Sequence, residues 1–173
     1  MKLETIETFV VGNPPPRHGG RYFIFVRLTT ACGVTGVGEI YNATFGPDLC
    51  AAMARDVFAR QFEGQDPHHI ERLWRRTYGA GFTMRPDVTV MGVLSGLEMA
   101  CWDIIGQAKG LPVYKLLAGT NAGDGDPNPR VHVYASGGVM WTFYDRGDGQ
   151  PYGVDALIAE ALRYQALGFD TFK

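Results

Sequence analysis

The sequence has no excess of charge of either sign. Its 173 residues include 16 Lys and Arg against 18 Asp and Glu, which gives a formal net charge of −2 at pH 7. A nucleic-acid-binding domain carries a basic patch, and electrostatic attachment to a membrane surface requires a polybasic segment. The composition offers neither, so we expect no nucleic acid and no membrane among the partners.

Long apolar runs and cysteine pairs are also scarce. The charge-free stretches fall well short of a membrane-spanning helix, and the first residues lack the pattern of a signal peptide. Apolar residues nevertheless make up 46% of the chain, which is enough to bury a core and excludes a disordered or fibrous protein. The three cysteines have no CxxC spacing, which predicts buried thiols in a reducing cytoplasm rather than disulfides. They are Cys32, Cys50 and Cys101.

Motifs for nucleotide binding and for serine hydrolases are absent. The sequence contains no Walker loop and no GxSxG. Gly33, Gly36 and Gly38 have the spacing GxxGxG and precede Glu39, whereas the dinucleotide fingerprint is GxGxxG at the start of a helix. We interpret these glycines as a tight β-turn that leads into a strand.

Two segments have residue types that bind metals but not the required spacing. His68 and His69, near Asp66, are adjacent and point to different sides of a helix, whereas zinc ligands on a helix are four residues apart. Asp124 and Asp126 lie in a loop without the glycine and the terminal glutamate of a calcium loop. No metal site is therefore predicted within the chain itself.

The first forty residues predict a three-stranded antiparallel β-meander. Residues 3–11, 21–30 and 34–40 are rich in β-branched and aromatic side chains or alternate in polarity. Consecutive prolines in residues 13–16 interrupt the first connection, and residues 31–33 form the turn of a hairpin.

Helical periodicity replaces the strand pattern after residue 47. Residues 48–62 predict one helix, and Asp66 followed by Pro67 predicts the N-cap and first residue of a second. The strongest period predicts a long helix that ends at Gly110, with small residues that allow a neighbour to pack closely. Its apolar face consists of Val90, Val93, Leu94, Leu97, Cys101, Ile104, Ile105 and Ala108, and the small residues are Gly92, Gly96 and Ala100.

The last forty residues predict the beginning of a parallel α/β domain. A short strand ends at Ala135, a helix is capped by Asp155 and runs through Leu167 to Gly168, and residues 169–173 begin another strand. Strand, helix and strand in this order form a βαβ unit, which is typical of a parallel sheet.

Polar and aromatic side chains occur in the connections of both parts of the chain. Charged groups there could meet a carboxylate and aromatic groups could form a wall, although ordinary surface loops are the alternative. Active sites of α/β sheets and barrels form at the carboxyl ends of the strands, where a serine follows the first parallel strand. The candidate substrate-binding residues are Arg17, His18, Tyr41, Asn42, Phe45, Arg85 and Ser136.

Lys173 is the candidate catalytic residue. Alternation along the last strand places Phe169, Thr171 and Lys173 on one face. If that face is the interior of a barrel, burial of an ammonium group would be costly without a function. A solvated lysine is the alternative.

Three groups of motifs follow one another along the whole chain. Residues 33–39 are GVTGVGE, residues 97–103 are LEMACWD and are followed by LLAG at 116–119, and residues 168–173 are GFDTFK. Together they resemble the enolase superfamily, and within it the mandelate racemase and muconate-lactonizing branch, with its GxxGxGE turn, long helix, LLGG exit and GFxxxKxK strand. The sequence departs from the usual residues of that branch at Cys101, Gln107 and Ala118.

The resemblance implies a two-domain enzyme of which this chain contains the first part. Residues 1–119 would form an α+β capping domain, made of a three-stranded antiparallel meander plus helices, and residues 120–130 a linker. Residues 131–173 would form the first βα unit and the start of the second strand of a TIM-type barrel, incomplete in this chain. The full-length protein is expected to be a homo-oligomer that binds a small-molecule carboxylate.

The superfamily also implies a reaction. Its members abstract the proton α to a carboxylate, with Mg²⁺ stabilising the enediolate. Lys173 matches the first lysine of the KxK pair, which contacts the substrate carboxylate, while the base and the three acidic Mg²⁺ ligands are expected beyond it. Arg17, His18 and Asn42 suit a polyhydroxylated acid, so we expect an acid-sugar dehydratase acting on an aldonate or aldarate. A racemase or cycloisomerase, or a catalytically inert partial chain, are the alternatives.

Overall fold

The computed structural model describes residues 1–14, 20–41, 45–79, 87–119, 130–136 and 153–173. The chain divides into two compact units. The first comprises Met1–Gly12 and Tyr22–Pro127, and the second comprises Asn13–Arg21 and Asn128–Lys173. The predicted linker lies almost entirely outside the described residues, so the predicted domain limits remain a prediction.

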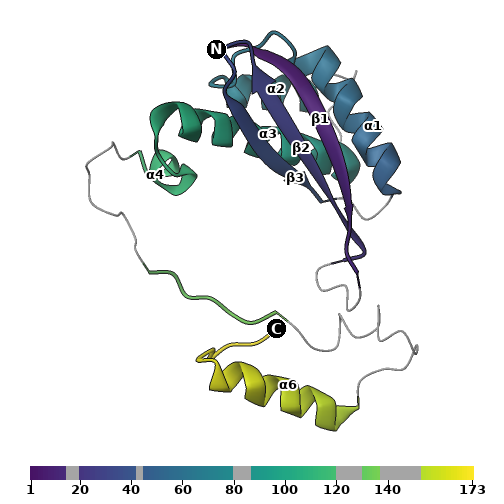
Figure 1. Ribbon diagram of the computed structural model, residues 1–173, viewed down its shortest axis with the longest axis vertical. Helices are drawn as coiled ribbons and strands as arrows, with labels where there is room; N and C mark the ends of the chain where they lie inside the picture. Colours follow the sequence, from purple (N-terminus) through teal and green to yellow (C-terminus); the bar gives the residue numbers. More distant parts are fainter. Residues whose placement is uncertain (15–19, 42–44, 80–86, 120–129, 137–152) are drawn as a thin grey trace. The chain divides into compact units, whose positions relative to one another are not determined.

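The first unit contains the expected antiparallel meander. β1 (Leu3–Gly12), β2 (Tyr22–Thr30) and β3 (Thr35–Ile40) form one sheet in the order β1-β2-β3 (Figure 1). The β2–β3 hairpin turns at Gly33, whose φ of 84° lies in the left-handed region that favours glycine. The Thr30 hydroxyl accepts the backbone N–H of Val34 at 3.0 Å, which closes this turn.

One face of the sheet packs on α3 (Val88–Lys109), the longest helix (Figure 1). Gly38 on β3 approaches this helix so closely that an added Cβ would lie 1.9 Å from the carbonyl oxygen of Gly96, and a Cβ at Gly36 would lie 2.2 Å from that of Ala100. The glycines of the GxxGxG segment therefore allow helix and strand backbones to pack together, and the expected close packing at Gly96 and Ala100 is confirmed.

The buried core lies between this face of the sheet and the helices. Alternate residues of β2 are almost completely buried, and so is one continuous face of α3. The members of this core include Ile24, Val26 and Leu28 of β2 and Val93, Leu94, Leu97, Ala100, Cys101 and Ile104 of α3. The two hydrophobic periods predicted from the sequence, two for the strand and 3.6 for the helix, thus meet in one core.

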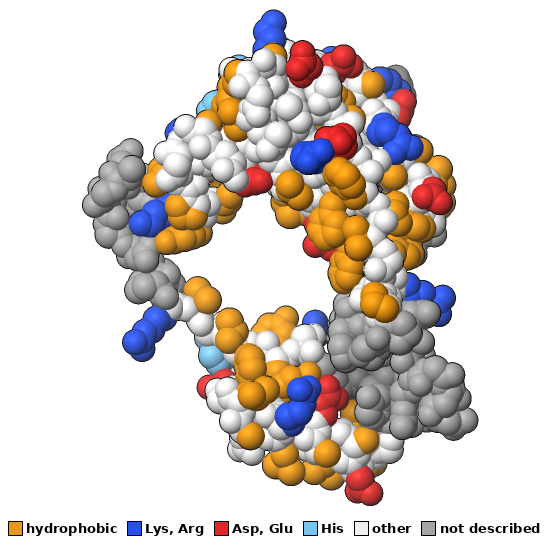
Figure 2. Space-filling view, in the orientation of Figure 1, with side chains coloured by type: hydrophobic (Ala, Val, Ile, Leu, Met, Phe, Trp, Pro, Cys, Tyr) orange, Lys and Arg blue, Asp and Glu red, His pale blue; other side chains and the backbone are white. Residues whose placement is uncertain are grey.

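The opposite face of the sheet is open. Phe9, Val11 and Val37 are between 41% and 50% exposed there, and hydrophobic side chains are visible at the surface of the first unit in Figure 2. Arg27 crosses this face from β2, where its guanidinium lies over the Phe9 ring at 5.5 Å and forms an ion pair of 2.6 Å with Glu7.

The ends of α3 are set by local signals. The Asp87 carboxylate accepts the backbone N–H groups of Thr89 and Val90 at 2.9 and 3.3 Å, and Gly110 ends the helix with a φ of 64°, as predicted. Among the described helices, α3 alone is long and apolar enough to cross a membrane. The lengths of the charge-free runs in the sequence did not predict such a helix. Core helices meet the same criterion, and the face buried against the sheet accounts for its apolar composition.

The shorter helices begin differently from the prediction. The helix expected at residues 48–62 is α1 (Pro47–Val57) followed by a π-helical turn, η1 (Phe58–Phe62). The helix expected to start at Pro67 is α2 (Ile70–Tyr78), with His69 at the N-cap position. The prediction was wrong because the Asp66 carboxylate accepts the backbone N–H of His68 at 3.0 Å and forms a local turn instead of capping the helix.

The second unit contains α6 (Val154–Ala166), which begins after Gly153. The predicted N-cap, Asp155, lies inside the first turn, where its carboxylate still favours the positive end of the helix dipole. Gly168 has a φ of 93° and ends this segment as predicted. The two predicted strands are reduced to one parallel bridge, Ala135 with Phe172. Within the described residues each strand has this one neighbour, and parallel strands are stabilised by neighbours on both sides.

Candidate functional site

One end of the sheet carries the connections in which binding residues were predicted. The register pairs Gly12 with Tyr22 and Ile24 with Ile40, so β1 ends, β2 begins and β3 ends at the same end of the sheet. Four of the predicted binding residues lie outside the described residues. They are Arg17 and His18 between β1 and β2, Asn42 between β3 and α1, and Arg85 before α3.

Asn13 closes the base of the first connection. Its backbone N–H donates to the carbonyl of Arg21 at 2.9 Å, and its side-chain Nδ2 donates to the carbonyl of Gly20 at 2.7 Å. From the sequence, Asn13 was predicted only to be part of a proline-rich break. The signal that could have identified it is an asparagine directly after a strand, where its amide can bond to nearby backbone.

Tyr41 and Phe45 lie in the connection between β3 and α1. The Tyr41 side chain is 78% exposed, and that of Phe45 is 40% exposed. The Tyr22 hydroxyl donates to the backbone carbonyl of Phe45 at 3.3 Å, which ties this connection to the start of β2. Phe45 is thus held through its backbone, and both aromatic side chains are accessible to a ligand.

The structure brings Ser136 and Lys173 to one face of the second unit. Ala135 and Phe172 are partners in the parallel bridge, and partners in a parallel pair point to the same side. Their successors, Ser136 and Lys173, therefore point to the opposite side, at the carboxyl ends of both segments. The bridge is held by the N–H of Ala135 donating to Thr171 and the N–H of Lys173 donating to Ala135, both at 2.9 Å.

A second contact joins the same two segments at their amino-terminal ends. Nε2 of His132 lies 2.8 Å from Oδ1 of Asp170, and the Thr171 hydroxyl donates to the same oxygen at 3.0 Å. The hydrogen bond from His132, followed by that from Thr171, lowers the pKa of the Asp170 carboxyl. This pair was not predicted from the sequence, because its members are 38 residues apart and neither belongs to a motif.

The described residues do not fit a divalent cation. No group of three or more His, Cys, Asp or Glu side chains comes together within the described part of the chain. Asp170, the acidic residue closest in sequence to Lys173, already accepts hydrogen bonds from His132 and Thr171. A magnesium ion requires several oxygen ligands at once, and the described residues do not bring them together.

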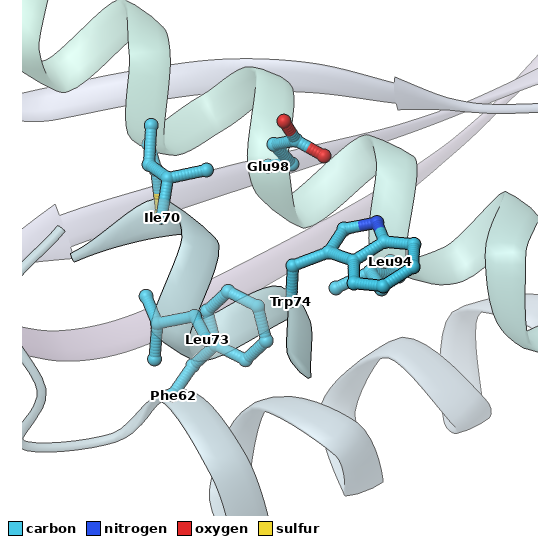
Figure 3. A pocket seen from close by; sticks show the side chains of 7 residues that line it. Phe62, Ile70, Leu73, Trp74, Leu94 and Glu98 are labelled. Carbon is cyan, nitrogen blue, oxygen red and sulfur yellow. The ribbon is translucent and has the colours of Figure 1, made fainter. Parts of the chain in front are cut away.

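A seam between η1, α2 and α3 is a packing feature of the first unit (Figure 3). Trp74, Leu94 and Glu98 line it with four other residues, and it has no volume that a water molecule could occupy. Burial and, to a smaller extent, the nearby Glu98 raise the pKa of the Cys101 thiol in this seam to about 12, so this thiol has no nucleophilic character. Cys50 and Cys101 are buried as predicted. Cys32 is exposed, so the prediction of a buried thiol was wrong there, because Cys32 lies in the turn between β2 and β3.

The sequence matches a known protein-family model. The family model for the N-terminal domain of mandelate racemase / muconate lactonizing enzyme matches residues 6–118. The chain belongs to this family. The matched residues include nearly all of the sheet, the helices α1 to α3 and the short helix α4 (Val113–Leu117). The capping-domain architecture expected from the enolase-superfamily resemblance is therefore confirmed.

Longer relatives match beyond the capping domain. A D-galactonate dehydratase from Xanthomonas campestris pv. campestris is 35% identical over the whole of this chain, which spans 38% of the length of that relative. A solved structure of a family protein from Labrenzia alexandrii DFL-11 is 72% identical, with a TM-score of 0.72 over 79% of this chain and 34% of that one. Another, from Burkholderia SAR-1, is 47% identical, with a TM-score of 0.82 over 99% of this chain and 40% of that one.

Proposed function

We propose that the full-length protein is a Mg²⁺-dependent enzyme of the enolase superfamily that dehydrates an acid sugar, an aldonate or aldarate. The observation that carries this proposal is the 35% identity to a D-galactonate dehydratase, which extends over all of this chain, including the capping-domain connections and the strand of Lys173. A polyhydroxylated acid is also the substrate that the polar candidates Arg17, His18 and Asn42 suit.

Lys173 supplies a cation for the substrate carboxylate in this proposal. It directly follows the parallel bridge on the strand proposed as the second of the barrel, and α/β barrels place their reacting groups toward the carboxyl ends of such strands. Ser136 lies on the same face and offers a hydroxyl that can donate a hydrogen bond to the same carboxylate. An ammonium and a hydroxyl on adjacent strands orient a carboxylate more firmly than a single lysine, because two directions of approach are fixed.

The connections of the capping domain supply further candidate substrate contacts in this proposal. Tyr41 and Phe45 supply exposed aromatic surface for the carbon chain, and Arg17, His18, Asn42 and Arg85 supply polar groups for its hydroxyls. When bound, Mg²⁺ would lower the energy of the enediolate formed by loss of the α proton. Its ligands and the base belong to parts of the full-length protein outside this chain.

The proposal also covers the cellular location, the kind of partner and the oligomeric state of the full-length protein. A cytoplasmic location agrees with three thiols that are free in the structure, and a small metabolite agrees with a chain that has almost no net charge. A homo-oligomeric full-length protein is proposed as well. The open face of the sheet, with Phe9 and Val11 exposed, is a surface that a second copy could cover.

A racemase or cycloisomerase of the same family is the second candidate, because the family model that matches is named for both reactions.

The chain by itself is expected to be inactive. α6 exposes Val154, Ile158 and Leu162 by 52% to 70%, and an apolar stripe of this size requires further chain to cover it.

The test is a screen of the full-length protein against aldonates and aldarates, with Mg²⁺ and with a chelator. We expect loss of water and formation of a 2-keto-3-deoxy acid from at least one substrate, and no product from the Lys173→Met variant. A matched control is Lys109→Met, which removes an exposed lysine at the end of α3. Racemisation without loss of water would refute the dehydratase assignment, and full activity of Lys173→Met would refute the role of that lysine.

A further inference from the structure

Few contacts fix the position of Lys173 relative to the neighbouring strand. Among the described residues, two backbone hydrogen bonds join residues 131–136 to residues 169–173, and both involve Ala135. Bonds to a single residue hold the described part of this ladder at one point only. A slip by one residue would turn Lys173 to the other face of the sheet, because side chains alternate along a strand.

The His132–Asp170 pair supplies a further point of attachment between the two segments. Its residues are 38 apart in sequence, one more than the bridge partners Ala135 and Phe172. The pair lies three residues before the hydrogen bond from Lys173 to Ala135 on both segments. A slip of one residue moves a strand by about 3.3 Å and would break the 2.8 Å contact, so the pair opposes such a slip.

The chemistry of the pair suits this task. The His132 ring can donate from Nε2 to the carboxylate whether it is neutral or protonated, so the contact does not depend on the charge of the ring. Asp170 also accepts the Thr171 hydroxyl at 3.0 Å, which fixes the orientation of its carboxylate against its own strand. The lowered pKa of Asp170 keeps this carboxylate ionised and able to accept both bonds at neutral pH.

We propose that His132 and Asp170 are positioning residues that set the register of the first two parallel strands and thereby aim Lys173 at the substrate. The catalytic part of this inference rests on the proposed function of Lys173. The part that concerns the register does not, because it is a statement about two hydrogen-bonded segments. The two parts are tested by different measurements.

Hydrogen exchange in the full-length protein tests the register. In Asp170→Ala we expect the backbone amides of Ala135 and Lys173 to exchange about fivefold faster, the effect of losing one side-chain hydrogen bond. Asp170→Asn keeps the acceptor oxygen and should restore slow exchange. Unchanged exchange at both amides in Asp170→Ala would overturn the proposal, and so would equal exchange in the two variants.

Steady-state kinetics with the turned-over acid sugar test the effect on Lys173. Asp170→Ala and His132→Ala should each lower kcat/KM by about tenfold, within the range for displaced catalytic groups, and the double variant should lose no more than either single variant. Asp170→Asn should recover most of the activity. His68→Ala is the matched control, since it removes an exposed histidine that also contacts an aspartate at 2.9 Å, and it should leave kcat/KM unchanged.

The Lys173→Met variant separates the two proposals. If this variant retains activity, the proposed function of Lys173 fails, but faster exchange in Asp170→Ala still supports the register role. If Lys173→Met is inactive and Asp170→Ala has the activity of the unmodified protein, the positioning role fails alone. Additive losses in the His132→Ala/Asp170→Ala double variant would also overturn it, because a shared contact can be lost only once.

Discussion

Replacement of Gly38 by alanine tests the packing of the capping domain most severely. The added Cβ would lie 1.9 Å from the carbonyl oxygen of Gly96 and 3.0 Å from the backbone nitrogen of Ala100. The first of these distances is about 1.6 Å short of the ~3.5 Å at which nonbonded atoms attract each other. Because both neighbours are backbone atoms, no side chain can rotate to make room, and α3 must move away from β3.

The expected cost follows from what this movement separates. α3 and the sheet share the buried core, so a shift of this size weakens contacts along the whole of the interface. Overpacking of a core costs about 1–3 kcal/mol, and we expect Gly38→Ala to lower the free energy of unfolding by about 3 kcal/mol, at the upper end of this range. Gly12→Ala is the control, since a Cβ there has no atom within 4 Å and its cost should be close to zero.

Hydrogen exchange of the β3 amides in the full-length protein is the suitable assay, because it reports on this domain separately from the rest. A loss of about 3 kcal/mol corresponds to exchange about 100-fold faster, since each 1.4 kcal/mol is a factor of ten. Gly12→Ala should leave these rates within a factor of three. If Gly38→Ala exchanged no faster than Gly12→Ala, the close helix–strand contact deduced here would be wrong.

Three further predictions concern other contacts of the same domain. Asp103 accepts a backbone N–H of edge strand β3 at 2.9 Å, so Asp103→Ala should destabilise by about 1.5 kcal/mol in urea denaturation, and Asp103→Asn by clearly less. The pKa of Asp66 is lowered to about 2, chiefly by the backbone N–H of His68, so its stabilisation is complete above about pH 4 and is lost as the pH falls toward 2. Acid titration of Asp66→Asn should lack this component, and an unchanged profile would contradict the assignment. Iodoacetamide should label exposed Cys32, whose pKa is lowered chiefly by the Thr30 hydroxyl, long before buried Cys101, and the reverse order would contradict the burial.

The parts of the fold that the sequence predicted well are those with strong local periodicity. The meander and α3 follow from alternation and from a 3.6-residue period, and both hold because burial of one face dominates their energy. The predicted N-caps Asp66 and Asp155 were wrong by three and two residues, since the observed N-caps are His69 and Gly153. A carboxylate that can cap a helix can equally well close a turn, and the sequence does not say which backbone N–H it will meet.

The candidate site was predictable to a smaller extent. Ser136 and Lys173 could be placed at the carboxyl ends of neighbouring strands by the logic of a βαβ unit, because a right-handed crossover brings the carboxyl ends of both strands together. That they share a face depends on the register of the bridge between Ala135 and Phe172. The His132–Asp170 pair could not, because a contact over 38 residues depends on the register of the two strands. The π-helical turn at Phe58–Phe62 was not predicted either, since its side-chain pattern is that of an ordinary helix.

The most direct test of the central claim is exchange of the α proton. The full-length protein would be incubated in D₂O with Mg²⁺ and an acid sugar such as D-galactonate, and the products would be followed by NMR. We predict loss of water and of the original α proton, no reaction with a chelator present, and no exchange with Lys173→Met. Exchange and product formation that persist in the chelator, or a complete library of acid sugars without any α-proton exchange, would contradict the account.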